Sequence, residues 1–191
     1  MEVFLFFCTI VNIFYKRRYL FKVYVFRYVT GSPQNLENAA SKLVFGTTYR
    51  RKPPLEEGPS VTDCLTSIHY IFKSALGIEI PLTFIGDMPR YLLSFGQWEA
   101  FCIERERAQV GDLVFVKNIK GQKGIAHVGL ILGVDRIFHC SKENGTATIE
   151  SDQRFFSMYE QRLTLLEMVC YIDSRNTRLR DKHQNNFIDV Y

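Results

Sequence analysis

The most regular pattern of hydrophobic positions lies between residues 111 and 141, where three stretches rich in β-branched and aromatic residues follow one another. Residues 111–116, 125–132 and 136–141 are separated by a segment rich in Lys, Gly and Asn and by a Gly-Val-Asp turn. Strand-forming stretches with such short connections are typical of a β-meander. We therefore predict three consecutive antiparallel strands.

An amphipathic helix is predicted over residues 64–76. Its apolar positions recur mostly three and four residues apart, at Leu65, Ile68, Ile71, Phe72, Ala75 and Leu76. Thr62 or Asp63 is the expected N-cap, and Gly77 is the expected end of the helix. Cys64 then falls in the first turn, where free backbone N–H groups and the helix dipole favour a thiolate. A second helix is predicted from residue 35 to about residue 42.

The first thirty residues differ in pattern from the rest of the chain. Residues 3–15 are mostly apolar, but this run is shorter than the roughly 20 residues of a transmembrane helix, and Lys16, Arg17 and Arg18 follow it. The segment fits an export leader or membrane anchor through residues 3–29, an element docked on the domain, or an upstream extension of the reading frame. In an anchored protein, the basic triplet would favour a cytoplasmic domain.

The domain organisation expected from these patterns has three parts. They are an apolar and basic leader or anchor segment (1–33), a single domain (34–174) and a polar tail (175–191). The length of 191 residues, 47% of them hydrophobic and 23% charged, fits one globular domain. The net charge of +4 equals the excess of five basic over one acidic residue in the first 29 positions, so no nucleic-acid-binding face is predicted.

Three residues are candidates for nucleophilic catalysis. Cys64 has the position of an activated thiol, and His127 and His139 lie on the second and third predicted strands. A three-residue connection at 133–135 would place both imidazoles on one face as diagonal neighbours, with the small Gly129 leaving room for a ring. A two- or four-residue connection would place them on opposite faces.

Two other interpretations of these residues stay open at this point. A single cysteine is most often a small buried hydrophobic residue, and the five cysteines of the chain form no C-x-x-C pair, which favours free thiols. A zinc site built from His127, His139 and Cys140 is disfavoured, because neighbouring residues of a strand face opposite sides and Cys140 adjoins His139.

Six short motifs in order give the sequence a resemblance to the NlpC family of papain-like cysteine peptidases, which cut bacterial cell-wall peptides. The resemblance spans roughly residues 36–145. The matching stretches are LVFGTTY (43–49), DC (63–64), ALGI with Pro81 (75–81), GDLVF (111–115), HVG (127–129) and RIFHCS (136–141).

The resemblance implies an α+β papain-like fold, in which N-terminal helices carry the nucleophile at a helix start and pack on an antiparallel β-sheet that carries the histidines. It implies Cys64 as nucleophile, His127 as general base and His139 as the residue that orients the base. No cofactor and no metal are implied. We expect the His127 ring within about 4 Å of the Cys64 sulfur, and the Cys64 backbone N–H as an oxyanion donor.

The family typically cleaves the bond after γ-D-glutamate in peptidoglycan stem peptides, a D-γ-glutamyl-diaminopimelate endopeptidase activity. The resemblance implies that Tyr49, Asp63 and Ser141 lie near the free amino end of this substrate, with Tyr49 and Asp63 bordering one cleft. A plain N-cap is the other role open to Asp63. A location in the cell envelope or periplasm follows from the family, while the oligomeric state is not predicted.

Two departures from the family pattern lie at the substrate groove. Leu65-Thr66 stands where the family has Ser-Gly, and residues 50–54 (RRKPP) replace a Gly-rich loop. The alternatives are therefore a peptidoglycan amidase of the CHAP type and a non-catalytic papain-like binding or scaffold module. A lipid acyltransferase of the permuted kind is disfavoured, because Cys64 precedes His127.

Overall fold

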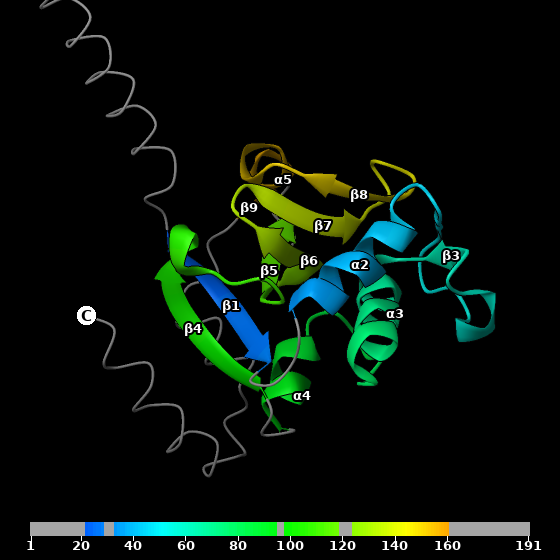
Figure 1. Cartoon of the computed structure of the whole chain (residues 1–191), viewed down its shortest axis with the longest axis horizontal. Helices are drawn as coiled ribbons and strands as arrows, with labels where there is room; N and C mark the ends of the chain where they lie inside the picture. The colour runs from blue at the N-terminus through cyan, green and yellow to red at the C-terminus, as the bar shows by residue number, and fades with distance from the viewer. Residues whose placement is uncertain (1–21, 29–32, 95–97, 119–123, 161–191) are drawn as a thin grey trace, which may run out of the picture.

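The computed structural model describes residues 22–28, 33–94, 98–118 and 124–160. Its centre is an antiparallel sheet with the strand order β4-β1-β5-β6-β7-β8, and β9 pairs with the end of β5 (Figure 1). The strands of this sheet are β1 (Lys22–Tyr28), β4 (Trp98–Glu104), β5 (Leu113–Asn118), β6 (Ile125–Gly133), β7 (Arg136–Cys140), β8 (Ala147–Glu150) and β9 (Tyr159–Glu160). The predicted meander is confirmed as β5, β6 and β7.

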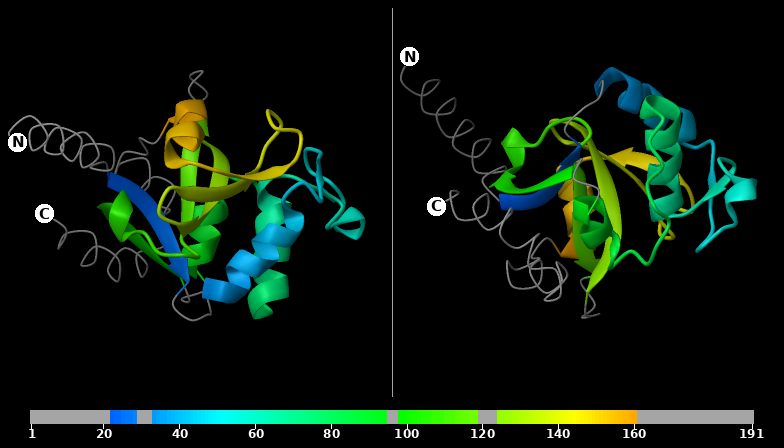
Figure 2. Two further views of the ribbon diagram at one scale, coloured as in Figure 1. Left: turned by 45° about the horizontal axis from the view of Figure 1, so that its top comes forward. Right: turned by 90° about the horizontal axis from the view of Figure 1, so that it is seen from below.

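Helices cover both faces of the sheet (Figure 2). The larger core lies under α2 (Pro33–Leu43), α3 (Cys64–Leu76) and α4 (Met88–Ser94), and a smaller cluster on the other face packs under α5 (Asp152–Met158). Two short strands, β2 (Thr48–Tyr49) and β3 (Val61–Thr62), pair in parallel before α3. Single 3-10 turns, η1 (Leu55–Glu57) and η2 (Arg105–Arg107), complete the described part. This arrangement confirms the expected α+β papain-like class.

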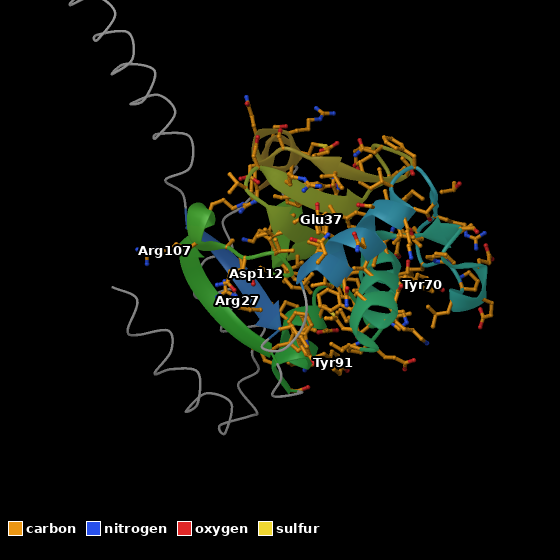
Figure 3. All side chains as sticks on the ribbon, in the orientation of Figure 1. Arg27, Glu37, Tyr70, Tyr91, Arg107 and Asp112 are labelled. Carbon is orange, nitrogen blue, oxygen red and sulfur yellow. The ribbon has the colours of Figure 1, made fainter. Side chains whose placement is uncertain are left out.

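Strand β1 corrects the expected boundary at residue 34. It pairs with β4 along its whole length and with β5 at Val25 and Phe26, and both of these side chains are fully buried. Arg27 adds a bidentate ion pair to the buried Asp112, with both N–O distances 2.8 Å (Figure 3). Because both edges of β1 are hydrogen bonded, residues 22–28 belong to the domain and not to a detached leader.

The remaining expectations for the two ends of the chain concern residues 1–21 and 175–191, which lie outside the described residues. Within the described ranges, no helix has the length and apolar character that a membrane crossing requires.

The connection between β6 and β7 determines which way the histidines face. Leu130 pairs with Phe138 and Ile131 with Ile137, but the register then shifts so that Gly133 pairs with Arg136. A two-residue turn at Val134 and Asp135 is thus combined with a bulge at Leu132, and the result is the register of a three-residue connection. His127 and His139 therefore lie on one face of the sheet, as the three-residue alternative predicted.

The start and end of α3 match the sequence pattern. Asp63 is the N-cap, and its Oδ1 accepts hydrogen bonds from the backbone N–H groups of Leu65 (3.1 Å) and Thr66 (2.9 Å). The Thr66 hydroxyl accepts in return from the Asp63 N–H at 2.7 Å, which completes a capping box. Gly77 ends the helix in the left-handed conformation with φ of 69°. Cys64 is thereby fixed at the first position of the helix.

Candidate active site

The sulfur of Cys64 lies at an opening in the central sheet. The pairing of β6 with β7 ends at Leu130 and Phe138, so the Val128 N–H beyond it is not used by β7 and donates instead to the Cys64 sulfur. Cys64 is half-buried, while the residues on either side of Val128 in β6 are His127 and Gly129. The helix start thus reaches the sheet immediately beside the predicted base.

His127 and His139 are in direct contact. His127 Nε2 lies 3.0 Å from His139 Nδ1, and the two rings are perpendicular with centroids 5.2 Å apart. Both side chains are buried, with exposed fractions of 5% and 0%. Since His139 occupies Nε2 of His127, the nitrogen that is left for the Cys64 thiol is Nδ1.

Burial determines the charge state of the cysteine–histidine pair. It raises the pKa of the Cys64 thiol to about 12, with smaller upward contributions from Asp63 and Cys140, while the Val128 N–H acts in the opposite direction. It also lowers the pKa of His127 well below 6.5, and His139 adds to this effect. The pair therefore rests as neutral thiol and neutral imidazole, and the expected thiolate stabilisation by the helix start is outweighed by desolvation and the Asp63 charge.

The three residues assigned to the substrate by resemblance have different surroundings. Tyr49 is half-buried on β2, and its phenol pKa is raised first by burial and then by Cys64 and Asp63. Asp63 uses Oδ1 for the helix cap, and its Oδ2 accepts from the Lys52 N–H at 2.9 Å. Ser141 is buried, and its hydroxyl accepts from the Asn144 N–H at 3.2 Å. Asp63 thus acts as an N-cap.

Sequence reasoning missed an aromatic side chain over the base. Tyr159, which follows α5, lies flat on His127 with ring centroids 4.5 Å apart and an interplanar angle of 9°. Phe155 of α5 meets His139 edge-on at 5.1 Å. Phe155 and Ile137 occupy the space expected to be left by Gly129: a Cβ there would lie 2.7 Å from Ile137 Cγ2 and 2.9 Å from Phe155 Cζ. No motif in the sequence marks either aromatic.

Sequence reasoning also missed Glu150 at the end of β8. Its Oε2 lies 3.3 Å from Nε2 of His139, on the side of that ring away from His127. A signal was available in principle, because Glu150 is the outermost polar residue of a fourth strand in the same meander. Recognising it requires the register of β7 against β8, which the turn at residues 141–146 does not reveal.

A pocket of about 380 Å³ lies at the start of α3, and residues of both departures from the family pattern line it. Its lining includes both residues that flank Cys64, together with the loop at residue 52 and a segment before α4: Lys52, Pro53, Asp63, Leu65, Thr66, Leu82, Thr83 and Phe84. Leu65 and Thr66 are themselves largely buried, so Leu82 and Phe84 supply its exposed apolar surface. The substituted positions therefore shape a groove without closing it.

The described residues offer no metal centre. Nowhere in these ranges do three or more His, Cys, Asp or Glu side chains converge on a position that suits a metal ion. Cys140 lies in the larger core, where its sulfur accepts a hydrogen bond from the Thr62 hydroxyl at 3.4 Å, on the opposite face from His139. Cys64 and Cys140 are both free thiols.

A cysteine at a helix start, bonded to an antiparallel sheet whose strands carry a histidine pair, is the arrangement of a papain-like α+β protein. Among such proteins the sequence matches one family: the NlpC/P60 family model aligns with residues 44–165. The chain belongs to the NlpC/P60 family, whose members are typically cysteine peptidases or cell-wall hydrolases. The match confirms the resemblance and extends it over α5 and β9. A search of curated protein sequences finds no match.

Comparison with solved structures finds NlpC and NlpC/P60 proteins. NlpC1 from Trichomonas vaginalis is 16% identical with a TM-score of 0.50, over 66% of this chain and 42% of that one. The NlpC/P60 domain of the peptidoglycan hydrolase SagA is 23% identical with a TM-score of 0.48, over 65% and 92% of the two chains. An NlpC/P60 family protein from Bacillus cereus is 22% identical with a TM-score of 0.48, over 69% and 39%. The match therefore spans less than half of the first and third of these chains.

Proposed function

We propose that this protein is a cysteine peptidase that hydrolyses peptidoglycan stem peptides at the bond between D-γ-glutamate and diaminopimelate. The observation that carries the proposal is the arrangement at the opening between β6 and β7. There the Cys64 sulfur accepts from the Val128 N–H, and the adjoining His127 is bonded through Nε2 to His139. Membership of the NlpC/P60 family supports the cell-wall substrate class.

In the proposed reaction, His127 Nδ1 takes the thiol proton as the Cys64 sulfur attacks the carbonyl carbon of the scissile amide. The Cys64 backbone N–H at the helix start is a donor for the oxygen of the tetrahedral intermediate. The carbon–nitrogen bond then breaks, and the leaving amine receives the proton from His127. Water, deprotonated by the same histidine, hydrolyses the thioester and restores the thiol.

Burial lowers the pKa of His127 and so keeps its ring neutral, with a lone pair that can accept the thiol proton. A buried neutral imidazole is available as a base at every pH above its own pKa, and it does not require a pre-formed thiolate. The Val128 N–H stabilises the negative charge that develops on sulfur during attack. Catalysis in this site is thus general-base assisted attack by a thiol.

The proposed substrate contacts follow from the residues around the nucleophile. Cys64 and Asp63 both act on the phenol of Tyr49, and Asp63 but not Tyr49 lines the pocket. In the proposed complex, the Asp63 carboxylate is the negative group offered to the free amine of a stem peptide. Ser141, behind Tyr159, completes the set assigned by resemblance. The pocket lined by Leu82 and Phe84 would hold the part of the substrate that extends past Cys64, away from the free amine.

The proposal is tested by mass spectrometry of defined stem-peptide fragments after incubation with the full chain. We expect cleavage after γ-D-glutamate by the wild-type protein and by Cys140→Ala, which removes a free thiol other than Cys64. Cys64→Ala is expected to give no product, and His127→Ala to lose about 10²-fold or more in rate.

Other products would point to the alternatives. Release of an intact stem peptide from muramic acid would identify an amidase of the CHAP type. Equal absence of product from the folded wild-type protein and from Cys64→Ala would identify a non-catalytic papain-like module.

We propose a cell-envelope location on the same grounds, because the substrate resides there. Residues 3–29 are the segment proposed for contact with the membrane, although residues 22–28 of this segment form β1. Fractionation of cells that express the full chain, with protease added to intact cells, tests the location. Recovery of the protein only in the cytosolic fraction, with protection from protease even after the outer layers of the envelope are opened, would contradict it.

A further inference from the structure

Three polar side chains form a diagonal line across β6, β7 and β8, and the third of them lies outside the proposed catalytic set. We infer that Glu150 is a positioning residue that fixes the tautomers of His139 and His127 and so keeps the nitrogen facing Cys64 free to accept a proton. This inference rests on the proposed function and adds a fourth member to the same site.

The register of the strands places these side chains on one face. His139 pairs with Thr148 of β8, so Glu150 is its diagonal neighbour two residues further along that strand. In the register of β6 and β7, His139 stands opposite Gly129, and His127 is its diagonal neighbour on the other side. Diagonal neighbours on one sheet face lie within reach of long side chains. The line therefore runs straight from the base to the carboxylate.

The contact between Glu150 and His139 joins two buried atoms that have no other place to bond. Oε2 of Glu150 lies 3.3 Å from Nε2 of His139, and neither atom makes a well-aligned hydrogen bond to any described residue. Leaving two buried polar atoms unsatisfied would cost far more than the small ring adjustment that brings them together. The two atoms are therefore each other's partners.

Asn144 holds the carboxylate in this orientation. Its side-chain NH₂ donates to Oε1 of Glu150 at 2.9 Å and to the Thr148 hydroxyl at 3.0 Å. Its backbone N–H donates to the Ser141 hydroxyl at 3.2 Å, which ties the loop between β7 and β8 to the same network. With Oε1 held by Asn144, Oε2 is the oxygen directed at His139.

A carboxylate at this place dictates the positions of two protons. An ionised carboxylate can only accept a hydrogen bond, so Nε2 of a neutral His139 must carry the hydrogen and Nδ1 must carry the lone pair. That lone pair accepts from His127, which puts the hydrogen of His127 on Nε2 and the lone pair on Nδ1. The base thereby has its acceptor nitrogen on the side of the ring that remains for Cys64.

Electrostatics agrees with this assignment. Burial lowers the pKa of His139, and the Glu150 and Glu143 carboxylates act in the opposite direction. His139 is thus neutral in the resting site, and as a neutral ring it can donate to Glu150 and accept from His127 at the same time. Glu150 also stabilises positive charge on the histidine pair when His127 takes the thiol proton.

Nitrogen-15 NMR of the imidazoles in protein labelled at histidine tests the assignment. In the wild-type protein, we expect His139 and His127 both to carry hydrogen on Nε2. In Glu150→Ala, we expect the hydrogen of His127 to move to Nδ1 in a large fraction of molecules. Glu150→Gln, whose amide oxygen can still accept, is the variant of matched shape and should show a smaller change.

The rate at which iodoacetamide alkylates Cys64, measured by mass spectrometry of the Cys64 peptide, gives a second readout. We expect Glu150→Ala to lower this rate and kcat by about 10- to 100-fold, with KM nearly unchanged, because a base in the wrong tautomer cannot take the thiol proton. Glu37→Gln, which removes one carboxylate from an exposed ion pair with Arg136, is the matched control and should equal the wild type (Figure 3).

Unchanged histidine tautomers in folded Glu150→Ala and Glu150→Gln, or unchanged alkylation of Cys64 in both, would overturn the assignment. The NMR measurement of the tautomers and the alkylation of Cys64 need no cell-wall substrate. A wild-type protein that fails to cut stem peptides but shows the expected tautomers and alkylation rates would therefore contradict the proposed function alone.

Discussion

The phenol ring of Tyr159 lies flat against the imidazole of His127, with the ring centroids 4.5 Å apart and the planes within 9° of parallel. The phenol hydroxyl reaches Glu143 at 3.4 Å, so the ring is held at both ends. Tyr159 also marks the point where β9 joins β5, opposite Asn118. The C-terminal part of the described chain thus shields the proposed base from water.

Removing this shield is expected to change the pH dependence of the site. Burial lowers the pKa of His127, so opening the ring to water in Tyr159→Ala should raise that pKa. The acidic limb of the rate profile, which follows protonation of the free base, should move to higher pH. Tyr159→Phe keeps the stacked ring and should leave the acidic limb in place. A profile for Tyr159→Ala that coincides with the wild type would contradict the shielding role.

Asp63 is expected to suppress the reactivity of Cys64. Burial is the largest cause of the raised pKa of the Cys64 thiol, and the charge of Asp63 is the second. An Asn side chain caps a helix as well as Asp does, so Asp63→Asn removes the charge and keeps the cap. Asp63→Asn should therefore lower that pKa and speed the alkylation of Cys64 by iodoacetamide at pH 8, where the thiol is mostly protonated. The exposed Asp87→Asn, which weakens a pairing with Arg90, is the control. Slower alkylation in Asp63→Asn would show that its cap and loop contacts outweigh its charge.

The same variant separates the two roles open to Asp63. If the carboxylate binds a substrate amine, KM for the stem peptide should rise in Asp63→Asn even though the thiol becomes more reactive. If Asp63 is a cap alone, KM should stay unchanged. Steady-state kinetics with a peptide that has a free amino end distinguishes these outcomes.

The helix that supports Phe155 is anchored by a buried ion pair. Arg105 donates to Asp152 Oδ1 from Nε at 3.2 Å and from a terminal nitrogen at 2.8 Å, and a terminal nitrogen also reaches the Gly133 carbonyl at 3.0 Å. Both side chains are at most 4% exposed. Asp152→Ala leaves a buried guanidinium without its partner and should cost about 3 to 5 kcal/mol in the free energy of unfolding.

Urea denaturation measures this cost, and an exposed pair provides the comparison. Glu37→Ala breaks the ion pair with Arg136, whose side chains are 29% and 45% exposed, and should cost less than about 1 kcal/mol. Equal losses of unfolding free energy in the two variants would mean that water takes the place of the Asp152 carboxylate and satisfies Arg105.

Gly129→Ala is expected to disturb both stability and activity. The added Cβ would lie 2.7 Å from Ile137 Cγ2 and 2.9 Å from Phe155 Cζ, and overpacking of this kind costs about 1 to 3 kcal/mol. Phe155 must move, and it touches His139, so kcat should fall as well.

Gly77→Ala is the control for Gly129→Ala. Its Cβ meets nothing within 4 Å, but its φ is 69°, so it should lose about 1 kcal/mol of stability with kcat unchanged. Thermal unfolding together with alkylation of Cys64 tests both variants. An active Gly129→Ala with a normal unfolding temperature would show that Phe155 and α5 can shift at little cost to make room for the added methyl group.

Local sequence determined the elements that carry the catalytic candidates. The apolar spacing between Leu65 and Leu76, with Asp63 before it and Gly77 after it, is enough to define α3 and to put Cys64 in its first turn. Alternation along β6 and β7 is enough to put His127 and His139 each on a definite side of its own strand. These are short-range properties, so the residues that create them are neighbours in the sequence.

Tertiary structure decided how these elements meet. The bulge at Leu132 sets the register that brings the histidines to one face, and a change of one residue would have separated them. Strand β1 looked like part of a leader because its buried character depends on β4, at least seventy residues away. Glu150 reaches the site through the register of β8 against β7, which the connecting turn does not reveal. Tyr159 reaches it through the path of the chain after α5, and this contact with His127 leaves no periodic signal in a single sequence.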